Sequence, residues 1–200
     1  RALFADKGGV KLNLPIYSVT DDLIKALLAY KRAILCAPPG AGKTTAVPLE
    51  MLKIPELRGR ILMLEPRRLA TRAAAERMAQ ILGEPVGQTI GYRIKGESKL
   101  SHKTRVEVVT EGILTRMIQS DGELSGVSAV IFDEFHERSL HADLGLALCL
   151  EISEALREDL LLLVMSATLE TGPISKLMGN APIIRAQGRK FPVTPIWLDR

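Results

Sequence analysis

Residues 33–44, Ala-Ile-Leu-Cys-Ala-Pro-Pro-Gly-Ala-Gly-Lys-Thr, decide the fold of this 200-residue chain. The apolar start predicts a buried strand, and the segment from Ala37 to Thr44 matches the P-loop pattern except that Ala37 replaces its first glycine. Glycines at positions 40 and 42 would let the backbone curl around a phosphate and point its amides inward. The alternative, an ordinary Pro/Gly turn between a strand and a helix, would specify no ligand.

Outward from this segment, short apolar runs alternate with amphipathic segments from Thr20 to the end of the chain. Strands are predicted at 33–37, 60–65, 89–94, 105–110, 129–133, 160–166 and 182–185. Helices are predicted at 21–29, 43–52, 68–82, 112–120, 140–156 and 174–178. Several strands are apolar nearly throughout, as expected of a parallel sheet covered on both faces. The pattern therefore predicts an α/β domain with a mostly parallel central sheet, which binds ligands beyond the carboxyl ends of its strands.

The chemistry of the P-loop comes from Lys43 and Thr44. Lys43 would reach the β- and γ-phosphates of ATP, and the Thr44 hydroxyl would bind Mg²⁺. The N-terminus of the following helix would add its dipole. The predicted ATP-binding residues of this loop are Pro39, Gly40, Ala41, Gly42, Lys43, Thr44 and Thr45.

Two carboxylates stand where the apolar run 129–132 stops, followed by Phe135 and His136. Asp133 would hold Mg²⁺ directly or through water, and Glu134 would orient or deprotonate the water that attacks the γ-phosphorus. Alternatively, these acids only favour the N-terminus of a following helix. The P-loop about ninety residues upstream favours the catalytic interpretation. The predicted catalytic residues are Lys43, Asp133, Glu134 and His136, and the predicted metal-binding residues are Thr44, Asp133 and Glu134.

Five short motifs follow one another along the chain. They are the P-loop, Pro66-Arg-Arg68, Thr110-Glu-Gly112, Asp133-Glu-Phe-His136 and Ser166-Ala-Thr168. This series resembles the DEAH group of superfamily 2 helicases, and the segments 37–40, 64–69 and 133–140 are most similar to its bacterial HrpB-type subgroup. Phe135 departs from the family pattern, in which alanine is usual. The resemblance covers roughly residues 14–198 and implies a RecA-like P-loop NTPase domain.

Arg67 and Arg68 follow the second strand and open a helix, so they are predicted at the same sheet edge as the P-loop. Their guanidinium groups could contact nucleic-acid phosphates, which fix position without reading bases. The alternative is a solvated basic first turn, although arginines there oppose the helix dipole. By resemblance, Thr110, Glu111 and Gly112 would also touch the RNA backbone, unless Thr110 is only a helix cap.

The resemblance also implies two further roles. In the DEAH helicases an arginine at the position of Arg77 stacks on adenine, and a surface network between Arg72 and Glu76 is the alternative. Ser166 and Thr168 could hydrogen-bond to His136 and so couple the ATP site to the nucleic-acid face. Helix capping is the alternative for this pair of hydroxyls.

Composition narrows the class of protein without naming its partner. Twenty-seven basic and 23 acidic residues give a net charge of +4, too mild to prove nucleic-acid binding. Cys36 and Cys149 lie in apolar segments and are predicted to be reduced core thiols, which favours a cytoplasmic location. No apolar run approaches the roughly 18–20 residues that cross a bilayer, so no membrane partner is predicted.

Three regions are predicted: an N-terminal extension over 1–13, the RecA-like domain over 14–187, and a connector over 188–200 toward a second RecA-like domain. The chain begins at Arg1 and is interpreted as a monomeric fragment. The resemblance implies the ATP-hydrolysing half of an ATP-dependent helicase, which binds single-stranded RNA or DNA, with RNA favoured, and hydrolyses ATP poorly alone. A nucleotide-gated clamp or an ATP-sensing domain is the alternative. A small-molecule kinase is disfavoured, since it needs neither the basic segment nor Ser166-Ala-Thr168.

Overall fold

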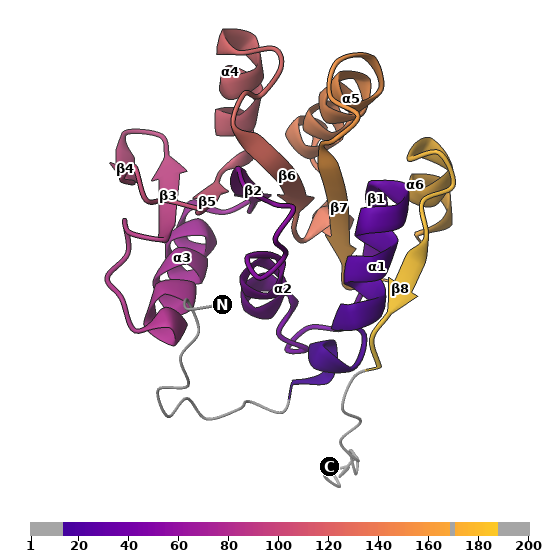
Figure 1. The fold of residues 1–200 in the computed structure, drawn as a ribbon, viewed down its shortest axis with the longest axis horizontal. Helices are drawn as coiled ribbons and strands as arrows, with labels where there is room; N and C mark the ends of the chain where they lie inside the picture. The colour runs from indigo at the N-terminus through magenta and orange to yellow at the C-terminus, as the bar shows by residue number, and fades with distance from the viewer. Residues whose placement is uncertain (1–13, 169–170, 188–200) are drawn as a thin grey trace, which may run out of the picture.

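A computed structural model describes residues 14–168 and 171–187 of the chain (Figure 1). The elements in chain order are η1 (Pro15–Ser18), α1 (Thr20–Tyr30), β1 (Arg32–Cys36), α2 (Lys43–Met51), β2 (Arg60–Leu64), α3 (Arg68–Leu82), β3 (Ile90–Ile94), β4 (Glu97–Lys99), β5 (Val106–Val109), α4 (Glu111–Ser120), β6 (Val127–Phe132), η2 (Phe135–Glu137), α5 (Leu140–Ala155), β7 (Leu161–Ser166), α6 (Gly172–Leu177) and β8 (Ile183–Arg185). The predicted extension over 1–13 and connector over 188–200 lie outside the described residues.

The strands form one sheet of eight in the order β4-β3-β5-β2-β6-β7-β1-β8. All neighbouring pairs are parallel except β3 and β4, which form an antiparallel pair from Tyr92 with Lys99 to Ile94 with Glu97. Every strand predicted from the apolar runs is present within two residues of its predicted bounds. The fold is therefore the predicted α/β domain with a mostly parallel sheet.

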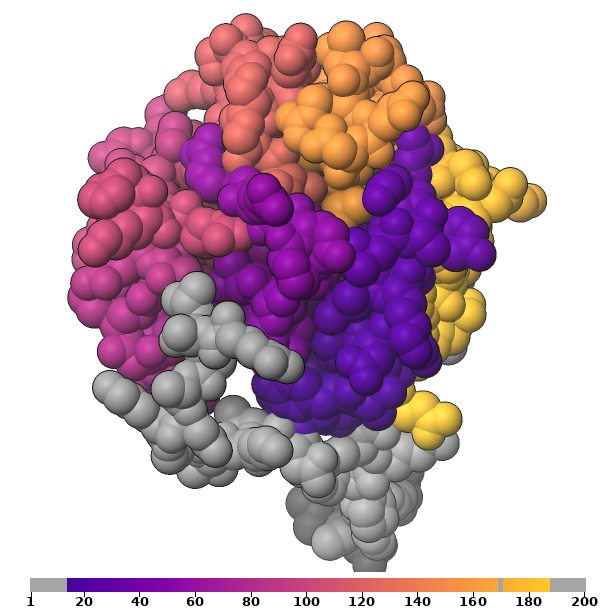
Figure 2. All heavy atoms as spheres, in the orientation of Figure 1, coloured from indigo at the N-terminus to yellow at the C-terminus, as the bar shows by residue number. Residues whose placement is uncertain are grey.

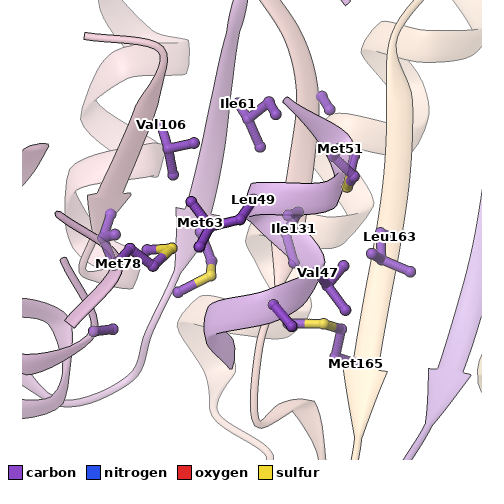
Figure 3. Close-up of a cluster of buried hydrophobic side chains, with 14 of the residues drawn as sticks. Val47, Leu49, Met51, Ile61, Met63, Met78, Val106, Ile131, Leu163 and Met165 are labelled. Carbon is purple, nitrogen blue, oxygen red and sulfur yellow. The ribbon is translucent and has the colours of Figure 1, made fainter. Parts of the chain in front are cut away.

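Alternating strand residues build two hydrophobic cores, one on each face of the sheet. On one face, Met63, Ile131 and Leu163 pack against α1, α2 and α3, and Figure 3 shows this side of the sheet facing Val47 of α2. On the other face, residues such as Leu62 and Val164 pack against α4, α5 and α6. The space-filling view shows the segments of α1 and α2 side by side over the first face (Figure 2). Burial on both faces explains why the central strands are apolar nearly throughout.

One short strand was missing from the sequence prediction. β4 turns back on β3 through Gly96, whose φ of 82° suits glycine. Its residues are Glu97, Ser98 and Lys99, so it presents no apolar run, and it lies at the edge of the sheet. Hydrophobic patterning cannot detect such a strand, because only its pairing with β3 defines it.

A buried carboxylate joins three neighbouring strands on this side of the sheet. Glu107 of β5 is fully buried, and its Oε2 accepts a hydrogen bond of 2.7 Å from Arg60 Nη1 of β2. Its Oε1 lies 2.9 Å from Arg93 Nε of β3, in an ion pair without hydrogen-bond geometry. Charge pairing between side chains therefore supplements the backbone hydrogen bonds that join β3, β5 and β2.

The two cysteines are free and buried, as predicted for reduced core thiols. Burial raises the pKa of both thiols, that of Cys149 to about 12. Within residues 14–168 and 171–187, no helix combines the length and the apolar content that crossing a bilayer demands.

Candidate nucleotide and nucleic-acid site

The five sequence motifs all follow the carboxyl ends of strands, and those strands are contiguous in the sheet. They are β5, β2, β6, β7 and β1 in spatial order. The Thr110 motif follows β5, the Arg67 segment follows β2, the acidic pair follows β6, the Ser166 motif ends β7 and the P-loop follows β1. Because parallel strands end at one rim, the order of the strands sets the order of the motifs along that rim.

The P-loop has the backbone that a phosphate cradle needs. Gly40 and Gly42 have φ values of 76° and 93°, a region that L-residues with a side chain rarely adopt. A Cβ on Gly42 would lie 2.5 Å from Leu14 Cδ1. The first amides of α2 have no intrahelical partner, and its N-cap Gly42 has no side chain to cap them, so they are available to a phosphate. Pro39 is exposed beside this turn, whereas Ala41 is buried.

The P-loop and the acidic pair meet directly. Lys43 Nζ lies 2.6 Å from Glu134 Oε1, and the side chains of these residues are only 5% and 25% exposed. Thr44 Oγ1 donates a hydrogen bond of 2.5 Å to Asp133 Oδ2. The two clusters therefore share one place at the rim, as a single metal-bound triphosphate requires.

Negative charge exceeds positive charge at this place. Burial raises the pKa of Asp133, although the Thr44 hydroxyl and the Lys43 charge act in the opposite direction. Glu65, buried at the end of β2, has its pKa raised to about 8 by burial and by the nearby charges of Asp133 and Glu134. Its Oε2 finds no hydrogen-bond partner among the described residues.

The donor set fits Mg²⁺. A hydroxyl and a carboxylate are hard oxygen ligands, and a divalent cation would offset the excess of carboxylates. The described residues contain no group of three or more His, Cys, Asp or Glu side chains able to hold a metal. Mg²⁺ typically uses one or two protein ligands and completes its shell with water and phosphate oxygens, so the Thr44 hydroxyl and the Asp133 carboxylate are a sufficient donor set.

Glu65 should make stability depend on pH. Its folded-state pKa of about 8 lies above the ordinary 4.5, so the folded chain holds a proton that the unfolded chain releases. The free energy of unfolding should therefore fall as pH rises from 4.5 to 8, by up to about 1.4 kcal/mol per unit. Glu65→Gln should remove this pH-dependent contribution and so stabilise the protein at pH 8, by up to about 4–5 kcal/mol.

Urea denaturation across this pH range, without nucleotide or Mg²⁺, measures the difference. Near pH 4.5 the variant and the wild type should be nearly equally stable, since both carry a neutral group there. If the two curves of unfolding free energy against pH were parallel, Glu65 would have the same pKa in the folded and the unfolded chain, and the expectation would be wrong.

The segment after Asp133 is a strained turn. Glu134 and Arg138 have positive φ values of 48° and 46°, which for residues with side chains cost on the order of 1–3 kcal/mol each. Between them, Phe135 is buried and packs edge-on against Phe132, with ring centroids 6.1 Å apart. The phenylalanine that replaces the usual alanine thus anchors this turn to the core.

His136 contacts the motif after β7, although not in the predicted way. Its Nδ1 accepts a hydrogen bond of 3.2 Å from the backbone amide of Ala167. The Ser166 and Thr168 hydroxyls instead lie 3.2 Å from each other. The predicted side-chain hydrogen bonds to His136 are therefore replaced by a backbone one. Because Nδ1 accepts this hydrogen bond, it cannot at the same time donate one to Glu134 Oε2, which lies 3.4 Å away.

Arg67 and Arg68 lie exposed at the N-terminus of α3. Arg67 pairs with Glu137, which lies in the turn over residues 134–139 that follows the acidic pair, here called the acidic turn. Two guanidinium nitrogens take part, and Nε lies 3.3 Å from Oε2. Arg68 donates to the Lys95 carbonyl at 3.2 Å. The first turn of α3 is thus not merely a solvated basic surface, because the Arg67 guanidinium has a specific carboxylate partner.

The Thr110 motif lies in the first turn of α4. Thr110 is the N-cap residue, yet its side chain makes no capping hydrogen bond. Glu111 accepts a hydrogen bond of 2.6 Å from Ser139, which itself caps α5. A hollow beside α4 is lined in part by Thr110, Gly112, Lys95 and Arg116. A hydroxyl, an open glycine and two cations therefore share this hollow.

Arg77 lies on the exposed side of α3 and donates to Gln80 at 2.7 Å. Arg72 pairs with Glu97 and lies over the Tyr92 ring, so its partner is not Glu76. The alternative network proposed for Arg77 is therefore wrong. Among the described residues, Arg77 therefore bonds to its own helix and to neither the P-loop nor the acidic pair.

The sequence interpretation assigned no role to Glu65, Ser139 or the Ala167 amide. Glu65 carried a detectable signal, since it is a charged residue directly after a buried strand. Ser139 and Ala167 carried none beyond their closeness to motifs. Their partners lie 28 and 31 residues away in the chain, so only the fold reveals them.

Comparison with known proteins decides the family. The profile described as DEAD/DEAH box helicase matches residues 17–177. The chain belongs to this family. It is 51% identical over 181 residues to the ATP-dependent RNA helicase HrpB of Escherichia coli K12, covering 90% of the chain and 22% of HrpB. It is 38% identical over 185 residues to the ATP-dependent RNA helicase HrpA of Borreliella burgdorferi, covering 92% and 22%.

The crystal structure of Escherichia coli DEAH/RHA helicase HrpB superimposes on the domain with a TM-score of 0.87, covering 90% of this chain and 23% of HrpB. The resemblance to HrpB-type DEAH helicases and the RecA-like fold are thereby confirmed. The chain spans about a fifth of the length of the curated relatives it matches.

Proposed function

We propose that this chain is the ATP-binding and ATP-hydrolysing half of an ATP-dependent RNA helicase of the DEAH-box, HrpB-like type. One observation carries the proposal: Lys43 and Thr44 bond to Glu134 and Asp133 at the rim that also bears Arg67 and the Thr110 motif. A nucleotide site and a basic, hydroxyl-bearing surface on one edge are what a nucleic-acid-dependent motor requires.

Each residue at the nucleotide site has a role in phosphoryl transfer. Residues 39–45 would cradle the phosphates through backbone amides, and Lys43 would bind the β- and γ-phosphates. The Lys43 ammonium would then contact both Glu134 and the phosphates, which would weaken its ion pair with Glu134. The Glu134 carboxylate would in this way be free to orient or deprotonate the attacking water. The 2.6 Å distance between Glu134 Oε1 and Lys43 Nζ supports this role, because Lys43 would bind the γ-phosphate that the water attacks.

The metal would be held by Thr44, Asp133 and Glu134. When bound, Mg²⁺ supplies positive charge that stabilises the charge developing on the γ-phosphate oxygens. The raised pKa of Asp133 supports this assignment, because an adjacent cation would favour the carboxylate that burial disfavours.

The nucleic-acid backbone would lie along the part of the rim that follows β5 and β2. Arg67 and Arg68 would contact phosphates, and Thr110 and Gly112 would contact the backbone through hydroxyl and amide groups. The carboxylate of Glu111 would repel phosphate, and its hydrogen bond to Ser139 supports a positioning role instead. Single-stranded RNA is the favoured partner, with single-stranded DNA the competitor.

Three other roles rest on the family resemblance. Arg77 would stack on the adenine, for which its exposed guanidinium is available on the solvent side of α3. His136 would relay between the sites through the Ala167 amide, with Ser166 and Thr168 shaping that segment. A second RecA-like domain would complete both sites. A cytoplasmic location and a monomeric domain are parts of the same proposal.

Competition binding tests the proposal. Full-length protein is titrated with labelled single-stranded RNA and DNA of one sequence, with and without a non-hydrolysable ATP analogue, over a salt series. We expect RNA to bind more tightly than DNA, with log affinity falling linearly in log salt. The analogue should change RNA affinity by about 5- to 150-fold. An RNA affinity that does not change when the ATP analogue is added would exclude a motor. The absence of RNA and DNA binding at low salt would exclude a nucleic-acid partner.

A further inference from the structure

The acidic turn occupies the middle of the rim. β6, from which it emerges, lies between β2 on the nucleic-acid side and β7 and β1 on the ATP side (Figure 1). Neighbouring strands are about 4.8 Å apart, so no side chain from β1 spans the distance to β5. The turn after β6 therefore lies on the direct route along the rim between the two sites.

Residues 134–139 contact all four other motifs. The contacts are Glu134 with Lys43, His136 with Ala167, Glu137 with Arg67 and Ser139 with Glu111. The first two face the ATP side, and the last two face the proposed nucleic-acid side. One six-residue segment thus joins the P-loop to both proposed RNA-binding segments.

The contact between Glu137 and Arg67 differs from the others because Arg67 is also proposed to bind a nucleic-acid phosphate. The carboxylate uses both oxygens against two guanidinium nitrogens, the fork geometry that arginine also offers to phosphate. Arg67 is 70% exposed and Glu137 33% exposed, so solvent and ligands reach the pair. A phosphate and the Glu137 carboxylate cannot both take the same fork.

We propose that Glu137 is a positioning residue that competes with nucleic-acid phosphate for the Arg67 guanidinium. Phosphate binding would release Glu137, and with it the strained turn that carries Glu134. The charge of Glu137 is also felt at the ATP site, where it is among those that raise the pKa of Glu65. The inference rests on the proposed function and adds how RNA occupancy reaches the catalytic carboxylate.

The test uses Glu137→Gln in full-length protein, which removes the charge but keeps the size. Without nucleotide, its affinity for single-stranded RNA should rise about 2- to 5-fold, as expected for loss of an exposed competing ion pair. Its RNA-independent ATP turnover should also rise, so the stimulation by RNA should fall by a similar factor of about 2 to 5, because one ion pair underlies both effects. A merely structural glutamate would weaken RNA binding or leave it unchanged.

Two comparisons make the result decisive. In an Arg67→Gln background, Glu137→Gln should no longer change RNA affinity, because its effect passes through Arg67. Glu154→Gln is the matched control. Glu154 is an exposed glutamate that pairs with Arg32 over 2.9 Å, and Arg32 lies at the start of β1, at the other end of that strand from the rim. This variant should behave as wild type. Arg67→Lys, which keeps the charge but loses the fork, should also lower the stimulation by RNA.

Unchanged or weaker RNA binding by folded Glu137→Gln would overturn the inference, as would an equal effect in the Arg67→Gln background. If Glu137→Gln fails to fold, a normal stimulation ratio in Arg67→Lys overturns it instead. Failure of the wild type to bind RNA would be a different result. It would overturn the proposed function itself, and the competition with it.

Discussion

Residues 1–200 alone should bind ATP with Mg²⁺ but hydrolyse it about 10³- to 10⁵-fold more slowly than a complete helicase carrying this domain. In-line phosphoryl transfer needs positive charge on both sides of the γ-phosphate. In the part of the chain that the structure describes, the lysine that pairs with Glu134 is Lys43, which comes from the P-loop side. The opposing arginines would come from a second RecA-like domain.

Steady-state ATPase assays with saturating single-stranded RNA measure this difference, and nucleotide binding is measured separately by fluorescence titration. Retained binding with feeble turnover is the expected pair of results. Robust RNA-stimulated turnover by these 200 residues would show that the domain needs no arginine from elsewhere.

Glu134→Gln in the full-length protein should lower the rate of ATP turnover by about 10²- to 10⁴-fold while ATP binding is retained. The variant keeps the side-chain volume beside Lys43 but loses the carboxylate that would orient or deprotonate water. The loss corresponds to about 3–5 kcal/mol of transition-state stabilisation. Single-turnover kinetics should place the defect in the chemical step.

Glu50→Gln is the matched control. Glu50 lies on α2, the helix that begins at Lys43, and it pairs with Lys53 over 2.6 Å, away from Asp133 and Glu134. This variant should turn over ATP as the wild type does. A Glu134→Gln protein with normal turnover would favour the clamp, in which hydrolysis matters little.

Most of the fold was predictable because its signals are local. Helix α3 begins and ends where the sequence predicted, since Pro66 precedes it and Gly83, with a φ of 72°, ends it. The central strands were predictable from apolar runs that burial on both faces requires. β4 was not, because a three-residue polar edge strand has no pattern of its own.

The site was predictable to the level of motifs but not of partners. Residues after parallel strands share a rim, so the meeting of the P-loop with the acidic pair could be expected. Which atoms bond depends on the turn between them. The positive φ of Glu134 sends His136 to the Ala167 amide and Glu137 to Arg67, and no spacing in the sequence encodes that choice.

The charged triad of Glu107, Arg60 and Arg93 has a consequence for protein engineering. Isolating a carboxylate from water is expensive, and replacing buried ionic groups together with well-packed apolar residues is often neutral or stabilising, by about 1–4 kcal/mol. Removing an arginine alone would leave the buried Glu107 carboxylate without that partner, whereas exchanging all three residues should raise the melting temperature. Because the triad lies within the sheet, on β2, β5 and β3, a heat-resistant version could be sought there without altering the motifs at the rim.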